Sequence, residues 1–294
     1  MKKILLSLMA VTALVSCSKS DDDSTYITEG TFPKKIVTKS ASGRVEAETT
    51  YTIQGGKILY FEGINYPVIG GAERIQQTIT YNGDLPQKTT SVSKDDKYTE
   101  EYQYEGEKLT KIIKTEEGAT KSTITSYSYS GDRLTKKVKE TPINTNEGEK
   151  TQVIEDEFNY AGNLITVNTI TYNRDAQGVK TNSQVSSTTY TVENDNLMKV
   201  ERSGVVLEEY TYDDKPNVQS IKLLQKLVPD YFIKNNFSKN NSLTEKKRYS
   251  LTGSLHNFKF TYDYNEKGYA KTKKRYSVDG NKAESLEYTM EYTY

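Results

Sequence analysis

Residues 102–109 read Tyr-Gln-Tyr-Glu-Gly-Glu-Lys-Leu, and this stretch decides the fold. Its two tyrosines alternate with polar residues, and alternate side chains of a strand share one face, so both rings point the same way. Gly106 supplies the positive φ that a tight hairpin turn requires. The stretch therefore predicts an antiparallel hairpin with aromatic side chains on one face.

Copies of this stretch recur from Thr31 to the carboxyl end. Tyr127 to Leu134 is a second clear copy, Phe158 to Leu164 is shortened, and weaker copies lie at 81–85, 190–197, 210–214 and 262–269. A second series of breaks lies between them, at Gly118, Gly148, Gly178, Gly204, Gly253 and Gly280. Two turns per unit make each unit one hairpin, so we expect an all-β antiparallel meander of roughly 16 to 20 strands.

The aromatic residues are expected to fill the inside of this sheet. The chain has 24 Tyr and 7 Phe but no Trp, and apolar residues make up only 34%. A long meander twists by ~20–25° per strand, so it should form a curled or barrel-like single sheet with an interior to fill. We predict that Tyr102, Tyr104, Tyr127 and Tyr129 face this interior; the alternative is an exposed platform for sugar rings.

One stretch departs from the repeat, near residues 219–242. Ile221, Leu224, Leu227 and Val228 have helical spacing, and Pro229 ends the pattern. We expect a short helix or loop there, which either packs on one edge of the sheet or acts as a functional lid.

The amino-terminal residues predict export and lipid attachment. Lys2 and Lys3 precede an apolar run of about 11 residues, too short for the ~20 of a membrane helix. Leu14-Val15-Ser16-Cys17 resembles the lipobox of exported lipoproteins. This implies cleavage before Cys17 and acylation of that residue. We expect a signal peptide at 1–16, a flexible tether at 17–30 and a repetitive β domain at 31–294.

The repeats resemble the tyrosine-aspartate repeats of Rhs-type proteins, most clearly at Tyr210-Thr211-Tyr212-Asp213 and Tyr262-Asp263-Tyr264. Together with the lipobox they resemble a Bacteroidetes outer-membrane lipoprotein family of unknown function with a porin-like β fold. Asp21 to Asp23 resembles the signal that exports such lipoproteins to the cell exterior. The resemblance implies an architecture and a location, the lipid-anchored outer face of the outer membrane, but no chemistry.

Residues for catalysis or metal binding are scarce. The single Cys lies at the processing site and the single His is His256, so cysteine-based and zinc sites are disfavoured. No Gly-x-Ser-x-Gly elbow accompanies His256, which we interpret as a surface or edge residue of a strand. We expect no catalytic residue, cofactor or metal.

Carboxylate pairs are present but carry little information in a chain with 40 acidic residues. Glu155 and Glu157 should share one face of a strand, whereas Glu100 and Glu101, Glu208 and Glu209, and Asp213 and Asp214 should point to opposite faces. An enzyme acting on envelope polysaccharide through carboxylates therefore stays an alternative.

One charged run bears on partners. Lys271, Lys273, Lys274 and Arg275 lie near tyrosines, but the balance of 40 basic and 40 acidic residues favours a solvated face that protects a sheet edge, without nucleic-acid binding.

The run Tyr288 to Tyr294 resembles the last strand of an outer-membrane barrel. Lys111, Lys137 and Glu101 on the alternate strand faces argue against insertion of the strands in lipid, since a lipid-facing Lys costs ~2–4 kcal/mol at the midplane. We expect a monomeric cell-surface lipoprotein that acts as a structural or binding module, its ligand a glycan or a partner protein.

Overall fold

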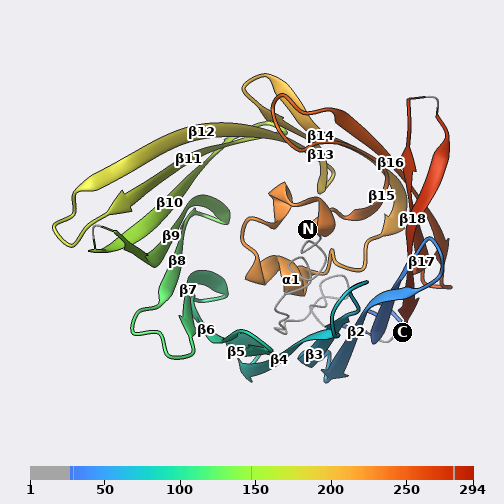
Figure 1. Cartoon of the computed structure of the whole chain (residues 1–294), viewed down its shortest axis with the longest axis horizontal. Coiled ribbons are helices and arrows are strands. Elements are labelled where there is room, and N and C mark those ends of the chain that lie inside the picture. Colours follow the sequence, from blue (N-terminus) through green and yellow to red (C-terminus); the bar gives the residue numbers. More distant parts are fainter. Residues whose placement is uncertain (1–26, 29, 147, 281) are drawn as a thin grey trace.

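The described residues fold into one closed β-barrel (Figure 1). A computed structural model describes residues 27–28, 30–146, 148–280 and 282–294. Cys17 and the predicted signal peptide lie outside them. Each strand pairs antiparallel with the next along the chain, and β1 closes the ring between β2 and β18. The predicted antiparallel meander is therefore confirmed, and it closes.

The barrel has 18 strands, within the predicted range. The strands are β1 (Lys35–Ser40), β2 (Val45–Gln54), β3 (Lys57–Asn65), β4 (Glu73–Asn82), β5 (Leu85–Ser93), β6 (Lys97–Glu105), β7 (Lys108–Glu116), β8 (Thr123–Ser130), β9 (Arg133–Thr145), β10 (Gly148–Ala161), β11 (Leu164–Arg174), β12 (Lys180–Glu193), β13 (Asn196–Arg202), β14 (Val205–Pro216), β15 (Asn240–Arg248), β16 (Leu255–Tyr264), β17 (Ala270–Val278) and β18 (Glu284–Thr293).

The two ends of the barrel differ. At one end, which we call the turn end, the repeated Gly motifs connect strands through two-residue turns, and Gly106 there has a φ of 60°. The described amino-terminal segment begins at this end, where the Ile27 amide donates to the Gly56 carbonyl at 3.2 Å. Most connections at the opposite end, the loop end, are longer, such as residues 66–72 and 249–254, although the long insertion at 217–239 joins β14 to β15 at the turn end.

The motif residues form an apolar layer inside the turn end. Ile58, Leu109 and Leu134 each follow a Gly turn and are almost completely buried. Tyrosine hydroxyls of the neighbouring hairpin donate to their carbonyl groups: Tyr81 to Ile58 at 2.7 Å and Tyr129 to Leu109 at 2.8 Å. The inward orientation of the paired tyrosines is confirmed, and each hydroxyl links one hairpin to the hairpin before it.

The insertion lies inside the barrel instead of on an edge. It comprises α1 (Lys222–Leu227) and the 3-10 turns η1 (Tyr231–Ile233) and η2 (Asn235–Phe237), shown in orange inside the ring in Figure 1. The predicted helix is confirmed. Its predicted place on a sheet edge is wrong, because a closed barrel leaves no free edge. We call residues 217–239 the plug.

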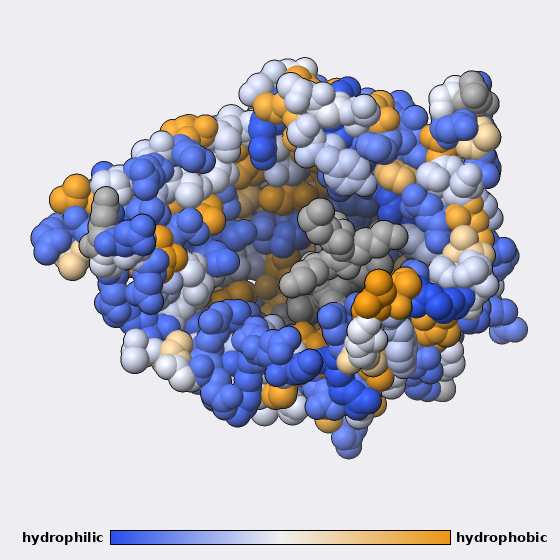
Figure 2. All heavy atoms as spheres, viewed as in Figure 1, coloured by the Kyte–Doolittle hydropathy of each residue, from blue (hydrophilic) through white to orange (hydrophobic). Residues whose placement is uncertain are grey.

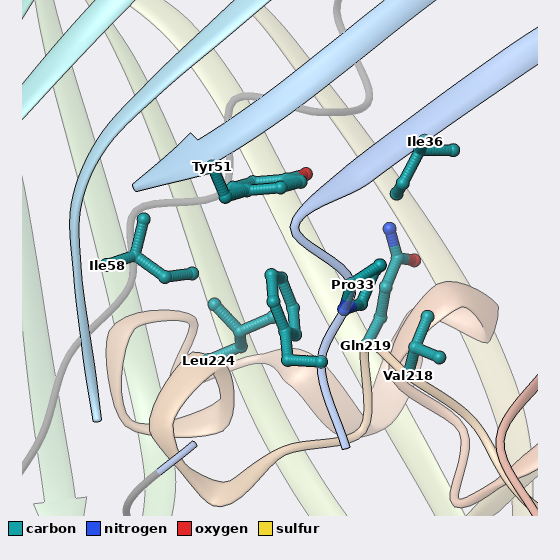
Figure 3. Close-up of a pocket in the computed structure, with 8 residues that line it drawn as sticks. Pro33, Ile36, Tyr51, Ile58, Val218, Gln219 and Leu224 are labelled. Atoms are coloured by element: carbon teal, nitrogen blue, oxygen red, sulfur yellow. The ribbon is translucent and has the colours of Figure 1, made fainter. Parts of the chain in front are cut away.

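The plug packs against the apolar layer. Leu224, Leu227 and Phe237 join the buried cluster that contains Ile58 and Leu109. In Figure 3 Leu224 lies beneath Ile58 and Tyr51 of the wall, and the cavity between them measures only about 10 Å³, the space of one water. The turn end is therefore closed from inside.

The outer wall is polar. Cross-strand ion pairs run over it, such as Lys35 with Glu48 at 3.1 Å and Lys88 with Glu101 at 3.3 Å. Figure 2 shows mainly hydrophilic residues over the strands that surround the hollow centre. No helix in the described ranges has the length and apolar character needed to cross a membrane.

One residue assigned to the outer face by sequence lies inside. Lys111 pairs with Gln103, and both Gln103 and Glu101 alternate with the inward-facing Tyr102, so Lys111 and Glu101 lie outside, as expected. Lys137, however, pairs with the inward-facing Tyr127. A β-bulge near Ser128 and Tyr129 shifts the alternation of β9 by one residue, which turns Lys137 into the barrel.

Candidate functional site

A cleft of about 350 Å³ lies in the loop-end half of the barrel. We call it the mouth cleft. Its wall is formed by β12, β13, β14 and β15 and by Tyr249, which directly follows β15. Ile233 of the plug also lines the cleft. The lining residues are Thr188, Tyr190, Val200, Arg202, Leu207, Glu208, Ile233, Lys247, Arg248 and Tyr249. Its size is within the ~300–1,000 Å³ of small-ligand sites.

The cleft has more positive than negative side chains. Arg202, Lys247 and Arg248 line the cleft with one carboxylate, Glu208. Lys247 shares the inner strand face with Glu208, whereas Arg248 is the next residue of β15 and starts on the opposite face. Lys247 is paired, with its Nζ 2.6 Å from Glu208 Oε1. Burial lowers the pKa of Lys247, but the hydrogen bond and charge of Glu208 outweigh this effect and raise the pKa above its ordinary value. Lys247 and Glu208 thus largely neutralise each other, and two guanidinium groups supply the excess charge.

These two guanidinium groups bond only to neutral acceptors in the described part of the chain. Arg202 Nε donates to Thr188 Oγ1 at 3.2 Å, and Arg248 Nε donates to the Val206 carbonyl at 3.4 Å. Nη1 of Arg248 also donates to the Gly253 carbonyl. No described carboxylate lies within ion-pair distance of either group. Both side chains are therefore held in place and keep their charge available for an anion.

Aromatic rings line the same cleft. Burial raises the pKa of Tyr190 to about 12, so its hydroxyl stays protonated at neutral pH. Tyr249 is 66% exposed, and its ring centroid lies 5.1 Å from that of His256, which in turn stacks on Phe258. A row of rings thus leads from the loop end into the barrel. His256 lies in a strand and is exposed, as expected, but the closed barrel gives it no edge position.

A second group of charges holds the plug. Asp230 is 4% exposed, and its carboxylate lies 3.1 Å from Lys137 Nζ and 3.4 Å from Lys234 Nζ. Burial alone would raise the pKa of Asp230, but the two ammonium groups lower it below its ordinary value. This ion-pair group joins β9 to the plug and has a structural role.

The carboxylates singled out in the sequence do not form an acid pair across a cleft. Glu155 and Glu157 share the outer face, as predicted, and both approach Lys136, at 2.8 and 3.9 Å. Glu208 and Glu209 point to opposite faces, and Glu209 pairs outside with Lys246 at 2.8 Å. Among the described residues, no three His, Cys, Asp or Glu side chains are grouped as a metal site would require.

The basic run in β17 does not protect an edge, contrary to the prediction. β17 pairs on both sides, and Lys273 and Arg275 face inward over aromatic rings, Lys273 4.6 Å from the centre of Phe260 and Arg275 3.8 Å from that of Phe258. Burial and the neighbouring Arg275 lower the pKa of Lys273 to about 8. Residues 288–294 resemble the last strand of a barrel in sequence, and they lie at the end of the chain where β18 pairs with β1 and closes the ring.

Sequence reasoning missed the mouth cleft. Its residues are scattered over the stretch from Thr188 to Tyr249, and no motif unites them. One feature of the sequence could have pointed to the cleft. Tyr249 is not part of a Tyr-x-Tyr pair of the repeat, and it lies next to Arg248.

Comparison with known proteins adds similarities of fold. No protein-family model matches the sequence, and no curated protein matches it. Among solved structures, the chain is similar to a porin-like protein from Bacteroides vulgatus ATCC 8482, with 12% identity and a TM-score of 0.42 over 90% of this chain and 98% of that one. It is also similar to a porin-like protein from Bacteroides uniformis ATCC 8492, with 13% identity and a TM-score of 0.38 over 89% of this chain and 97% of that one. The fold and the site define a closed, polar-walled β-barrel with a plugged lumen and a basic, aromatic cleft.

Proposed function

We propose that the protein is a lipid-anchored binding module on the outer face of the outer membrane, and that its barrel presents the mouth cleft to a ligand. The ligand class is a glycan or a partner protein. The observation that carries this proposal is the mouth cleft itself, in which fixed guanidinium groups and an exposed tyrosine ring meet in a space of ligand size.

The polar outer wall supports anchoring by lipid on Cys17. Ion pairs such as Lys35 with Glu48 favour a wall in water, because charged groups facing lipid are costly. The described chain begins at the turn end, so a tether from Cys17 would approach the barrel there. Of the predicted tether at 17–30, the ten residues 17–26 precede Ile27, which bonds to the barrel, and ten residues reach at most ~33–36 Å. This arrangement directs the mouth cleft away from the anchor.

The test is a binding screen of the mature chain against a glycan array and against extracts of cell-surface proteins. Selective retention of a glycan or protein, with loss of retention in a variant of the mouth cleft, is the expected result. Release of shortened products from bound glycans would instead favour the alternative, an enzyme acting on envelope polysaccharide. Failure of every glycan and protein to bind would contradict the proposal.

A further inference from the structure

We infer that the mouth cleft binds a small acidic saccharide, with the acid group held by Arg202 and a sugar ring against Tyr249. This inference rests on the proposed binding function and names its ligand class. It also assigns the residues that would recognise the ligand.

The acid group follows from the state of Arg202. A guanidinium group prefers a planar oxyanion, to which it can donate two parallel hydrogen bonds. Arg202 uses Nε on the neutral Thr188 Oγ1, so its conformation is fixed before a ligand arrives. Preorganised donors lose little entropy on binding. Lys247 is excluded as the main contact because Glu208 already pairs with it.

The sugar ring follows from the tyrosines and the apolar wall. Val200, Leu207 and Ile233 line the cleft beside Tyr190 and Tyr249. Tyr249 is largely exposed, and it stands in a row with His256 that keeps its ring oriented. A sugar ring with an apolar C–H face and a polar rim suits such a surface, since aromatic rings pack on C–H groups while hydroxyl groups reach the polar side chains.

The size of the cleft favours a small ligand. A volume of about 350 Å³ lies at the small end of the range for ligand sites. An acidic peptide is the rival ligand, because it offers the same carboxylates. It lacks the C–H face of a sugar ring that Tyr249 would contact, so we favour the saccharide.

Titration calorimetry of the mature chain in detergent tests the inference. The probes are trigalacturonic acid, its methyl ester, which keeps the rings but removes the charge, inorganic sulfate and a tetraglutamate peptide. We expect the acid to bind at least about tenfold more tightly than the ester, since a hydrogen bond to a charged group contributes ~1.5–3 kcal/mol. Its affinity should fall as salt rises.

Three variants locate the site. Arg202→Gln should weaken binding of the acid about tenfold, while Arg74→Gln, on the outer wall beside Glu62, should leave it unchanged. Tyr249→Ala should weaken binding of trigalacturonic acid but not of sulfate. Unchanged melting temperatures of these variants would show that folding is intact.

The outcomes separate the inference from the proposed function. Equal binding of the acid and its ester, or equal loss in Arg202→Gln and Arg74→Gln, would overturn the inference and leave a binding module for another ligand. Tighter binding of tetraglutamate than of trigalacturonic acid would overturn the saccharide class. Failure of all four probes overturns the inference alone, and only a screen in which no glycan or protein binds overturns the proposed function.

Discussion

At the scale of residues, the tyrosine hydroxyl is what distinguishes this barrel interior from an aliphatic core. Tyr160 donates to the Leu134 carbonyl at 2.7 Å in the same way as Tyr129 donates to Leu109. The carbonyl groups lie beside β-bulges, where the strand ladder is interrupted. A phenylalanine in the same place would fill the space but leave these carbonyl groups without their tyrosine donors.

Tyr104 provides an internal contrast. Its hydroxyl is buried and has no hydrogen-bond partner, and burial raises its pKa well above the ordinary value. We expect Tyr129→Phe to lower the free energy of unfolding by about 1 kcal/mol, the net contribution of one hydrogen bond. Tyr104→Phe should be neutral or slightly stabilising. Urea denaturation of the two variants measures both effects, and an equal loss in both would contradict the role given to the Tyr129 hydroxyl.

Truncation of the same ring tests packing instead of hydrogen bonding. Tyr104 packs against the buried cluster of the plug and wall. Tyr104→Ala should therefore lower the free energy of unfolding by ~3–5 kcal/mol, the range for a buried aromatic residue. A variant that melts like the parent protein would show that the ring is dispensable, as an exposed sugar platform would be.

At the scale of elements, the plug covers the apolar layer at the turn end of the barrel. α1 is only six residues long, too short to be stable alone, so its packing on Ile58 and Leu109 must support it. Phe232 adds an edge-to-face contact with Phe158 at 6.0 Å. The ion pairs of Asp230 fix the plug to β9.

The pH dependence of stability tests the Asp230 contact. Because its folded pKa is lowered, Asp230 contributes stability above the unfolded value of about 4, and this contribution is lost as pH falls through the folded pKa. Asp230→Asn should therefore melt lower than the parent at pH 7, and the gap should shrink below about pH 4.

Asp132→Asn is the matched control, since the Asp132 side chain is 98% exposed in a turn. It should melt like the parent at every pH. A gap for Asp230→Asn that stayed constant down to pH 2 would show that the charge of Asp230 does not hold the plug.

At the scale of the whole molecule, the outer wall of the barrel is largely polar. Many aromatic and aliphatic side chains point inward, and ion pairs such as Lys35 with Glu48 lie outside, unlike the apolar outer band of a lipid-embedded barrel. The proposed lipid on Cys17 would then attach such a barrel to the membrane.

Removal of the acylated residue tests this arrangement. Cys17→Ala should block processing and release the protein from the outer membrane or mislocalise it. Separation of the membranes followed by immunoblotting measures the change. Retention of the variant in washed outer membranes would show that the barrel itself inserts in lipid, or that another segment anchors it.

The sequence by itself determined the hairpins and their inner face. Residues 102–109 hold the Tyr-x-Tyr pair, the Gly turn and the Leu within eight residues. The alternation places both tyrosines on one strand face, and the positive φ of the Gly specifies a tight hairpin turn. The short helix near Leu224 was also predictable from spacing. These features are local, so local chemistry decides them.

Tertiary structure decided closure, the place of the plug and the mouth cleft. Closure joins β1 to β18, far apart in the chain, and depends on twist and register accumulated over all strands. Lys137 faces inward only because one bulge shifts the alternation of its strand. Arg202 and Tyr249 meet in one cleft because neighbouring strands place them together, and side chains so distant in sequence share no motif that could reveal it.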